Sequence, residues 1–327
     1  MRALLAKPQA RRIFLLGATG TIGRATAQAL VQRGHDVVCF LRPGAATHGL
    51  AGAELRFGDV TDARSLVEDG LRGEQFDVVI SCLASRTGVS ADSWAVDHRA
   101  NSHALAAARD AGAAQFILLS AICVQHPRLA FQHAKLAFEA ALVASGMPYT
   151  IVRPTAFFKS LSGQVARVRS GKPFLLFGDG RATACKPVSD TDLATYLADC
   201  VGNADRINHI LPIGGPGPAI TPRQQGELLF ALTGQVPRFR SVPPGLLKGM
   251  AALLDAVGLV LPAAARKAEL ARIGHYYATE SMLVRDPVTG RYDADATPET
   301  GRETLADHYR ALLAGERADE RGEHAVF

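Results

Sequence analysis

The sequence has few of the residues that build cross-linked or metal-bound scaffolds. Its 327 residues include only five cysteines, which are spread along the chain without a C-x-x-C pair. This odd and scattered set argues against a disulfide framework, a zinc ribbon or an iron–sulfur cluster. We therefore expect reduced thiols, as in a cytoplasmic protein, and no metal site.

Long apolar runs are also lacking. The most apolar stretch, residues 245–261, carries Lys248 and Asp255 and is interrupted by Gly249 and Gly258, so it does not qualify as a transmembrane helix. Two interpretations of this stretch stay open: a buried or pocket-lining helix, or a surface that touches a membrane or an apolar ligand. The N-terminal twelve residues have no apolar core of secretory length.

The charge is modestly positive and has no basic run. The chain has 36 Lys and Arg against 31 Asp and Glu, and the basic residues are scattered. This distribution suits an anionic small molecule better than a nucleic acid.

What the sequence does contain is an alternation of short apolar runs with helical patterns. Hydrophobic residues make up 48% and charged residues 20%, and the length favours about two structural units. Strands are predicted at 11–17, 35–42, 53–59, 77–84, 115–121 and 149–154, and helices at 21–33, 94–111 and 131–145. Because these strands are apolar throughout, the pattern predicts an α/β fold, a doubly wound parallel sheet of the Rossmann type.

A glycine-rich turn, Gly17-Ala-Thr-Gly20-Thr-Ile-Gly23, lies between the first strand and the first helix. This position is the one that a dinucleotide fingerprint requires. Gly17 permits the tight turn, Gly20 lets the backbone approach a pyrophosphate, and Gly23 allows close packing of helix on strand. The helix N-terminus then offers free N–H groups to the phosphates. Gly17, Thr19, Gly20, Thr21, Ile22 and Gly23 are therefore the expected cofactor-binding residues of this turn.

The second strand ends in Arg42, where an NAD enzyme usually has a carboxylate for the ribose 2′-hydroxyl. A guanidinium pairs instead with a 2′-phosphate, with Arg24 as a second candidate, so the sequence predicts NADP(H). Asp59 and the adjacent Val60, after the third strand, are expected near the adenine. An alternative role for Asp59 is to cap a helix that begins at Ala63.

These features predict an NADP-binding Rossmann domain over residues 11–158, with returning segments near 183–215. Residues 159–315 would form mainly a smaller substrate-binding part, since beyond Pro154 the pattern weakens and Gly/Pro clusters multiply. The termini, 1–10 and 316–327, are expected to be loose.

The arrangement resembles the extended and atypical (NmrA-like) short-chain dehydrogenase/reductase superfamily, which has a Y-x-x-x-K pair on the helix after the fifth strand. Here that helix reads Phe131-Gln-His-Ala-Lys135. The resemblance implies that Lys135 binds the nicotinamide ribose and is the catalytic residue, and that Pro154 lies beside the cofactor. Phe131 replaces the tyrosine that protonates a carbonyl oxygen, which argues against ordinary alcohol–ketone chemistry.

A narrower resemblance covers nearly the whole chain. Residues 123–142, 151–165 and 172–194 are similar to the NADPH-dependent divinyl chlorophyllide 8-vinyl reductases of chlorophyll and bacteriochlorophyll synthesis. The resemblance implies reduction of the 8-vinyl group of a divinyl (proto)chlorophyllide to ethyl, a tetrapyrrole as the small-molecule substrate, and no metal or flavin. It also suggests contact at the periphery of a photosynthetic membrane.

For the substrate, Phe131, Phe157 and Phe158 are expected as apolar walls for a flat ring, or else as core aromatics. Lys159 and Lys186 are candidates for the propionate carboxylate. The proton donor stays open among Lys135, His126, His133, Cys185 and water. Two other functions also stay open: reduction of a different C=C or imine substrate, and NADP(H) binding without catalysis, as in a sensor or an assembly protein. The oligomeric state is not predicted.

Overall fold

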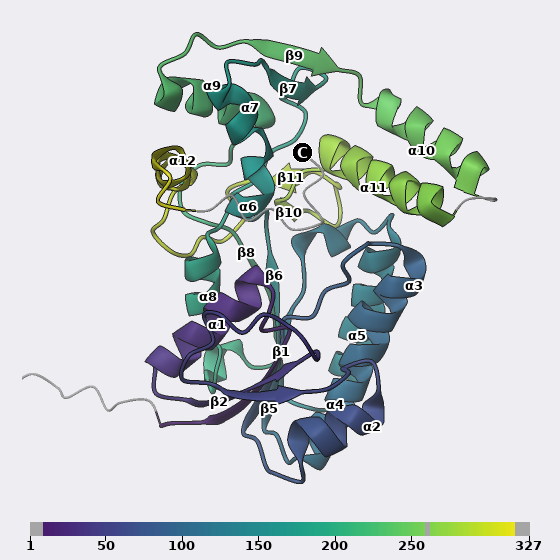
Figure 1. Cartoon of the computed structure of the whole chain (residues 1–327), viewed down its shortest axis with the longest axis vertical. Coiled ribbons are helices and arrows are strands. Elements are labelled where there is room, and N and C mark those ends of the chain that lie inside the picture. The colour runs from purple at the N-terminus through teal and green to yellow at the C-terminus, as the bar shows by residue number, and fades with distance from the viewer. Residues whose placement is uncertain (1–8, 259–261, 318–327) are drawn as a thin grey trace, which may run out of the picture.

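A seven-stranded parallel sheet forms the centre of the first of two lobes in the computed structural model, which describes residues 9–258 and 262–317 (Figure 1). Every pair of neighbouring strands in this sheet is parallel. The strands, in spatial order, are β3 (Glu54–Phe57), β2 (Asp36–Leu41), β1 (Arg12–Leu16), β4 (Val78–Ser81), β5 (Gln115–Leu119), β6 (Tyr149–Pro154) and β8 (His209–Ile213). The predicted α/β fold class is confirmed.

Helices cover both faces of the sheet. Alternate residues of β1 supply the two cores: Ile13 and Leu15 pack on one face, and Phe14 and Leu16 on the other. One face is covered by α1 (Thr21–Gln32) and α8 (Asp190–Ala198), and the other by α4 (Asn101–Asp110) and α5 (Ala130–Ala144). The short helices α2 (Ala63–Ser65) and α3 (Ser90–Ser93) each continue into a π-helical turn, at Leu66–Leu71 and Trp94–Ala100. Strands buried on both faces explain why their sequences are apolar without alternation.

The helix α5 begins and ends one residue before the predicted bounds of 131–145, and it buries a different face. Its sequence suggests an apolar face through Leu136, Ala140 and Val143, yet Ala140 is exposed and Val143 is 44% exposed. The buried positions are instead Gln132, Ala134, Lys135, Phe138, Glu139 and Leu142. Gln132, Lys135 and Glu139 are polar, and each has a partner within the protein. The buried face of α5 is therefore not visible in the sequence as a helical repeat of apolar residues.

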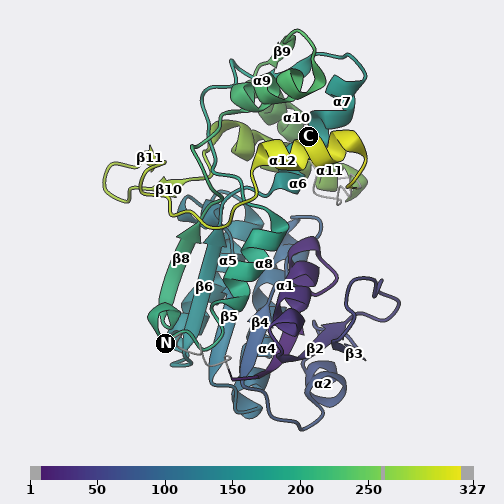
Figure 2. The ribbon, with the colours of Figure 1, turned by 90° about the vertical axis from the view of Figure 1, so that its left-hand side faces the viewer.

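The second lobe lies above the carboxyl ends of the strands (Figure 2). Its elements are α6 (Phe158–Leu161), α7 (Val165–Arg169), β7 (Phe174–Phe177), α9 (Pro222–Thr233), β9 (Phe239–Val242), α10 (Gly245–Gly258), α11 (Pro262–Thr279), β10 (Val284–Arg285), β11 (Tyr292–Asp293) and α12 (Leu305–Ala314). A separate core that includes Phe158, Phe230 and Tyr309 holds α6, α7, α9 and α12 together.

Two segments after Pro154 return to the first lobe. The helix α8 packs against α1, and β8 pairs with β6 as the edge strand of the sheet. Both lie within or beside the expected returning segments at 183–215. The domain boundaries at 158 and 315 stay predictions, and the expectation of loose termini falls mostly outside the described residues.

Most of the apolar stretch 245–261 forms α10 (Gly245–Gly258), which packs against α11 in a helical hairpin, and residues 259–261 lie outside the described residues. Ala251 is buried on the inner face, whereas Leu246 and Leu253 are 54% and 68% exposed on the outer face. The interpretation as a buried helix therefore holds for one face only. None of the helices in the described part of the chain is long and apolar enough to span a membrane.

Candidate active site

The carboxyl ends of the central strands bring most of the predicted site residues to one edge of the sheet. The glycine turn follows β1, Arg42 follows β2, Asp59 follows β3, and Pro154 ends β6. The strand order reverses between the neighbouring strands β1 and β4, because the chain runs outward from β1 through β2 to β3 and then returns to β4 on the other side of β1. The glycine turn after β1 therefore lies at this switch point. Open parallel sheets bind their ligands at this point.

The glycine turn is shaped by two close backbone contacts. Gly17 has a φ of +79°, and a Cβ there would lie 2.5 Å from the carbonyl oxygen of Cys82 at the end of β4. A Cβ at Gly23 would lie 2.2 Å from the carbonyl oxygen of Gly17. Both positions therefore require glycine for steric reasons. Gly20 has no such contact: it is exposed, has an extended backbone, and is the N-cap of α1.

The first turn of α1 is open to an anion. Because its N-cap is a glycine, no side chain accepts hydrogen bonds from its leading N–H groups. The side chain of Ile22 is buried in the core, so this residue can contribute only its backbone to a ligand. Free N–H groups and the positive end of the helix dipole together favour a phosphate here.

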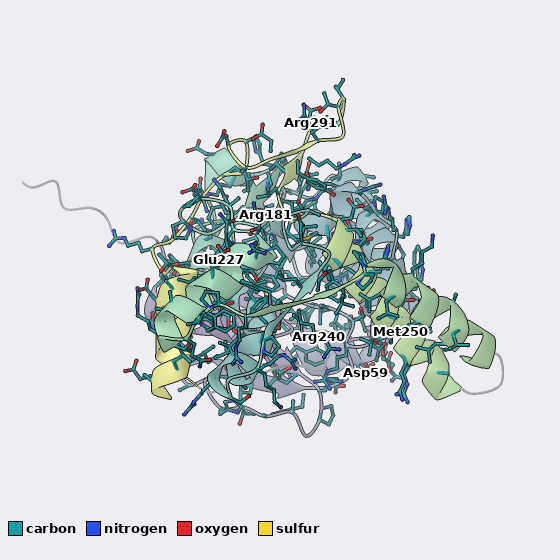
Figure 3. All side chains as sticks on the ribbon, turned by 90° about the horizontal axis from the view of Figure 1, so that it is seen from above. Asp59, Arg181, Glu227, Arg240, Met250 and Arg291 are labelled. Carbon is teal, nitrogen blue, oxygen red and sulfur yellow. The ribbon has the colours of Figure 1, made fainter. Side chains whose placement is uncertain are left out.

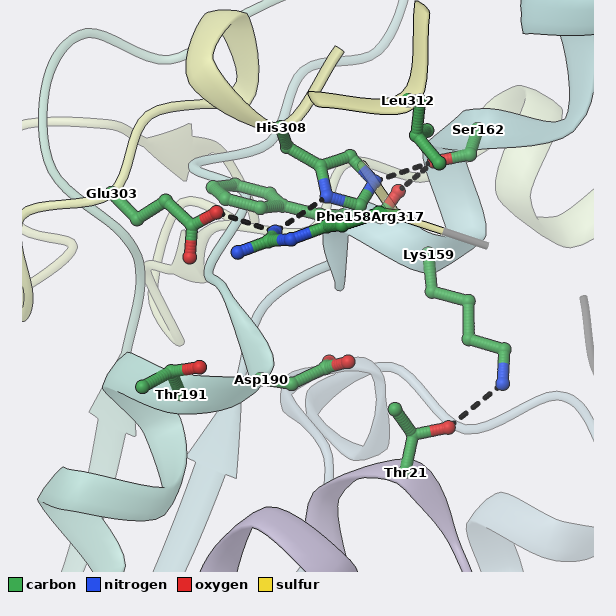
Figure 4. Close-up of a pocket in the computed structure, with 10 residues that line it drawn as sticks. All are labelled: Thr21, Phe158, Lys159, Ser162, Asp190, Thr191, Glu303, His308, Leu312 and Arg317. Carbon is green, nitrogen blue, oxygen red and sulfur yellow. Dashed lines mark hydrogen bonds and ion pairs between the residues drawn. The ribbon is translucent and has the colours of Figure 1, made fainter. Parts of the chain in front are cut away.

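Lys159 reaches this turn from the second lobe (Figure 4). Its Nζ donates a hydrogen bond of 2.7 Å to Thr21 Oγ1 in the first turn of α1. Both residues line a pocket of about 300 Å³ between α1, α6, α8 and α12. The sequence makes Lys159 a candidate for the propionate carboxylate, but its position favours a phosphate at the glycine turn.

The adenosine end of the site brings Arg42 and Asp59 together, and Arg24 contacts the glycine turn. Hydrogen bonds from the side chain and backbone of Thr61, together with the charge of Arg42, lower the pKa of Asp59. Arg24 donates to the carbonyl oxygen of Thr19 at 3.1 Å, while its Nε is buried without a hydrogen-bond partner. A buried donor without a partner is costly, which fits a ligand that completes this end of the site.

The helix-capping alternative for Asp59 is wrong. Asp59 Oδ1 accepts hydrogen bonds from the N–H and hydroxyl of Thr61, at 2.8 and 2.7 Å, in a local turn. The cap of the helix that begins at Ala63 is Asp62, whose side chain accepts from the N–H of Arg64. Val60 is half-buried and packs against the core beneath β3.

Lys135 is not a solvent-facing residue. Its side chain is 10% exposed, and its Nζ lies 2.9 Å from Oδ1 of Asp97, which is 1% exposed. The Asp97 carboxylate also accepts from the N–H of Ser85, in the loop after β4, at 3.3 Å. Asp97 belongs to the π-helical turn before α4, and such turns are frequent at functional sites. The structure thus places one fixed ammonium group beside the end of β4.

The three phenylalanines expected as walls do not gather in one place. Phe131 packs in the cluster that joins α5 to α11, Phe157 packs against the core of the sheet, and Phe158 is buried in the core of the second lobe. Phe158 and His308 are neighbours in the lining of the pocket of Figure 4, with ring centroids 5.3 Å apart. A single aromatic wall made by all three is therefore not observed, because consecutive residues on a short extended segment point to opposite sides.

Several polar side chains that the sequence offers for the propionate carboxylate or as the proton donor are buried, exposed or bound to other protein groups. Lys186 is buried and holds Glu299 and the carbonyl oxygen of Thr297, so it is not free for a propionate. Burial raises the pKa of the Cys185 thiol to about 12. His133 is exposed on α5, and His126 lies 3.2 Å from Glu280. Of the side chains that the sequence offers as proton donors, Lys135 lies near the carboxyl end of β4, in an ion pair with Asp97.

The sequence does not predict two further residues of this region, one beside Lys135 and one beside Cys123. Asp97 could have been noticed, because it shares a helical face with Ala100, Ala104 and Ala108, and a carboxylate on a buried face needs a cation. The other is Tyr277 of α11. Its ring is 38% exposed, while burial of its hydroxyl against Cys123 raises its pKa well above the ordinary value. No sequence pattern relates α11 to α5, so the contact of Tyr277 with Cys123 cannot be predicted from the sequence.

Comparison with known proteins agrees with this geometry. Residues 17–204 match the model of the NAD(P)H-binding family. The divinyl chlorophyllide a 8-vinyl-reductase, chloroplastic, of Cucumis sativus is 48% identical, and the alignment covers 98% of this chain and 80% of that protein. The protein of the same name from Oryza sativa subsp. indica is 47% identical, with 98% and 83% covered.

Among solved structures, the NADPH complex of an NADPH-dependent quinone oxidoreductase from Escherichia coli has a TM-score of 0.69 to this chain. It covers 92% of this chain and 99% of the other at 20% sequence identity, which supports the fold alone. The two plant reductases match at far higher identity and over nearly the whole length. This chain therefore belongs to the divinyl chlorophyllide a 8-vinyl-reductase family.

Proposed function

We propose that this protein reduces the 8-vinyl group of a divinyl chlorophyllide or protochlorophyllide to an ethyl group with NADPH, in chlorophyll or bacteriochlorophyll biosynthesis. The observation that carries this proposal is identity of 47–48% to plant 8-vinyl reductases over 98% of this chain. The site also supports the proposal. It has the glycine turn of a dinucleotide site and the buried Lys135, but Phe131 stands where the superfamily has its tyrosine.

The residues present fit NADPH. Exposed Gly20 and the uncapped start of α1 fit the pyrophosphate, with Lys159 as an additional cation. Arg42 fits the 2′-phosphate, and Arg24, which contacts Thr19 of the glycine turn, has a buried Nε without a hydrogen-bond partner. Lys135 and Pro154 would flank the nicotinamide ribose. When bound, NADPH supplies the hydride.

Phe131 is compatible with this reaction. Hydride addition to a vinyl group conjugated with a tetrapyrrole leaves negative charge on the macrocycle and not on a discrete alkoxide. A phenol aimed at an oxygen is then unnecessary. A proton added to the other vinyl carbon completes the ethyl group, and water or the Lys135 ammonium can supply it.

Lys135 would act as a fixed positive charge beside the reacting groups. Its ion pair with Asp97 holds the ammonium at one position, and preorganised charge of this kind stabilises a developing anion most effectively in a dry site. Asp97 would act as a positioning residue, because its carboxylate contacts Lys135 and the Ser85 backbone.

The location of the protein within the cell is a separate matter. The names of the plant relatives describe them as chloroplastic. For this chain, a cytoplasmic location at the periphery of a photosynthetic membrane stays a prediction.

The test is reduction of a divinyl pigment by purified protein and NADPH, followed as a blue shift of the Soret band. Lys135→Ala should lower kcat by roughly 30- to 1000-fold, since loss of one positioned charge commonly costs about 2–4 kcal/mol. His133→Ala, an exposed change on the same helix, is the matched control and should keep the wild-type rate. NADPH binding without turnover would favour the sensor or assembly alternative, and turnover of other C=C or imine substrates only would favour the alternative reductase.

A further inference from the structure

The last turns of α11 lie over the two loops that follow β4 and β5. Figure 3 shows the helical hairpin of α10 and α11, marked by Met250, extending from one side of the body. Nearer the end of α11, Ile273 packs on the loop after β4, where a Cβ at Gly88 would lie only 2.6 Å from Ile273 Cδ1. The hydroxyl of Tyr276 donates a hydrogen bond of 2.9 Å to the carbonyl oxygen of Cys123, in the turn after β5. These contacts fix the end of α11 at the carboxyl edge of the sheet.

Tyr277 brings a second hydroxyl to this edge. Its phenol is in hydrogen-bonding contact with the Cys123 thiol, so the hydroxyl is buried while the ring is 38% exposed. The charge of Lys135 acts on the same thiol. The Tyr277 phenol and the Lys135 ammonium therefore lie in one region, at the carboxyl ends of β4 and β5.

The same region contains Phe131, the residue that replaces the superfamily's tyrosine. Its ring packs against the cluster that includes Ile273 and Tyr276 of α11. The helix α5 therefore contributes a phenyl ring and Lys135 to this region, whereas α11 contributes the phenol of Tyr277. A tyrosine hydroxyl near the buried lysine is thus supplied by the second lobe and not by α5.

The phenol of Tyr277 is held in the form that can donate a proton. Burial of the hydroxyl, with smaller effects of the Cys123 and Tyr276 side chains, raises its pKa well above the ordinary value of 10.0. The group is therefore protonated throughout the neutral pH range. A positioned acid of this kind commonly accelerates proton transfer to a reacting centre by about 100- to 10,000-fold.

We propose that the hydroxyl of Tyr277 donates the proton that completes the ethyl group, which makes Tyr277 a catalytic residue. This inference rests on the proposed function and names the acid for its second step. Hydride adds to the terminal vinyl carbon, the π bond breaks, and its electron pair moves onto the macrocycle. A C–H bond then forms at the inner vinyl carbon as the O–H bond of Tyr277 breaks, and the phenolate regains a proton from solvent. The vinyl group is thus reduced by one hydride and one proton, and NADPH is oxidised to NADP⁺.

The experiment compares wild type with Tyr277→Phe, which keeps the ring and removes only the hydroxyl. With NADPH and a divinyl pigment, kcat should fall by about 100- to 10,000-fold, while KM for the pigment should not change. Fluorescence titration with NADPH and absorbance titration with the monovinyl product should give wild-type dissociation constants, which establishes that the site is intact. The matched control is Tyr196→Phe on α8, whose ring centroid lies 4.1 Å from Cζ of Arg206. This variant should keep the wild-type rate.

A second readout separates proton donation from a structural role. At constant pH, the residual rate of Tyr277→Phe should rise with the concentration of imidazolium buffer, whereas the wild-type rate should not change. A Tyr277→Phe rate equal to that of wild type, or a lower rate without this buffer dependence, would overturn the proposal. If wild type itself reduces no divinyl pigment, the proposed function fails, and the role of Tyr277 fails with it. If wild type and Tyr277→Phe reduce the pigment equally well, only the role of Tyr277 fails.

Discussion

At the scale of single residues, Arg42 is expected to determine the choice of dinucleotide. Its side chain is exposed at the end of β2, and its charge acts on Asp59, so it lies at the adenosine end of the site. A charge-assisted hydrogen bond contributes roughly 1.5–3 kcal/mol. Arg42→Ala should therefore weaken NADPH binding about 10- to 150-fold and leave NADH binding nearly unchanged.

Fluorescence titration with each cofactor measures this difference. Arg64→Ala is a suitable control, because Arg64 is an exposed arginine of α2 that pairs with Glu68. It should leave both affinities unchanged. Equal losses of NADPH and NADH in Arg42→Ala would show that Arg42 does not bind the 2′-phosphate.

A second prediction concerns Phe131. Phe131→Tyr restores the superfamily's Y-x-x-x-K pair, yet we expect no increase in kcat, since the charge that develops is spread over a macrocycle. The ring packs in an apolar cluster with Ile122, Leu129 and Ile273. A hydroxyl without a partner there costs about 1–3 kcal/mol, so KM for the pigment should rise.

Steady-state kinetics at saturating NADPH give both constants for wild type and variant. A clear increase in kcat would mean that protonation at position 131 limits the rate, and our explanation for the missing tyrosine would then be wrong.

The residues of the site differ in how well the sequence predicts them. Arg42 and Lys135 lie at fixed offsets from predicted strands and helices, so local spacing places them. The partner of Lys135, Asp97, is 38 positions away in the chain, and only tertiary packing brings the two together. Lys159 follows two phenylalanines in the sequence, which suggests a position in the substrate site. In the structure its Nζ instead donates a hydrogen bond to Thr21.

At the scale of elements, the glycine turn and α1 offer a matched pair of substitutions. Gly23→Ala would place a methyl group 2.2 Å from the Gly17 carbonyl oxygen, which backbone movement alone can relieve. At Gly20 the nearest atom is 3.4 Å away and φ is −72°, so alanine is accepted there. We expect Gly23→Ala to lower the free energy of unfolding by roughly 1–3 kcal/mol or more.

Gly20→Ala should keep wild-type stability and instead weaken NADPH, because its methyl group would point toward the expected pyrophosphate. Urea denaturation and cofactor titration of both variants separate the two effects. A stable Gly23→Ala protein with wild-type affinity would contradict the assigned packing.

The sheet was easier to predict than the second lobe for a physical reason. Strands buried on both faces are apolar along their whole length, and glycines end the helices between them. Each strand and helix of the first lobe can therefore be predicted from its own local sequence. In the second lobe, β7 and β9 are short strands far apart in sequence, and α6 has four residues. Their positions depend on contacts such as that of Tyr309 with the Leu161 carbonyl oxygen, which no local pattern encodes.

At the scale of the whole molecule, Glu280 connects the two lobes. It follows α11, and its carboxylate binds Arg128 at 3.0 Å and His126 at 3.2 Å, both from the segment before α5. The hydroxyl of Tyr292 donates to the same carboxylate at 2.6 Å. Although burial opposes it, hydrogen bonds from Tyr292 and His126 and the charge of Arg128 lower the pKa of Glu280.

This shift predicts how stability responds to acid. A carboxyl group whose pKa is lower in the folded state than in the unfolded state stabilises the fold fully above the unfolded value, here 4.5. That stabilisation is lost as the pH falls from 4.5 through the lower folded pKa. Glu280→Gln lacks this contribution at every pH. Its melting temperature should therefore lie below that of wild type near pH 7, and the two should converge as the pH falls below 4.5 and through the lower folded pKa.

Calorimetric melting of wild type, Glu280→Gln and Glu227→Gln over this pH range makes the comparison. Glu227 is a half-exposed acid of α9 that pairs with Arg223 one helical turn away, so Glu227→Gln controls for the loss of one surface charge and should follow wild type. Parallel curves for wild type and Glu280→Gln would contradict the role of Glu280 between the lobes. Convergence would show that acid weakens the attachment of α11 to the nucleotide-binding lobe, because the carboxylate is the group that Arg128, His126 and Tyr292 share.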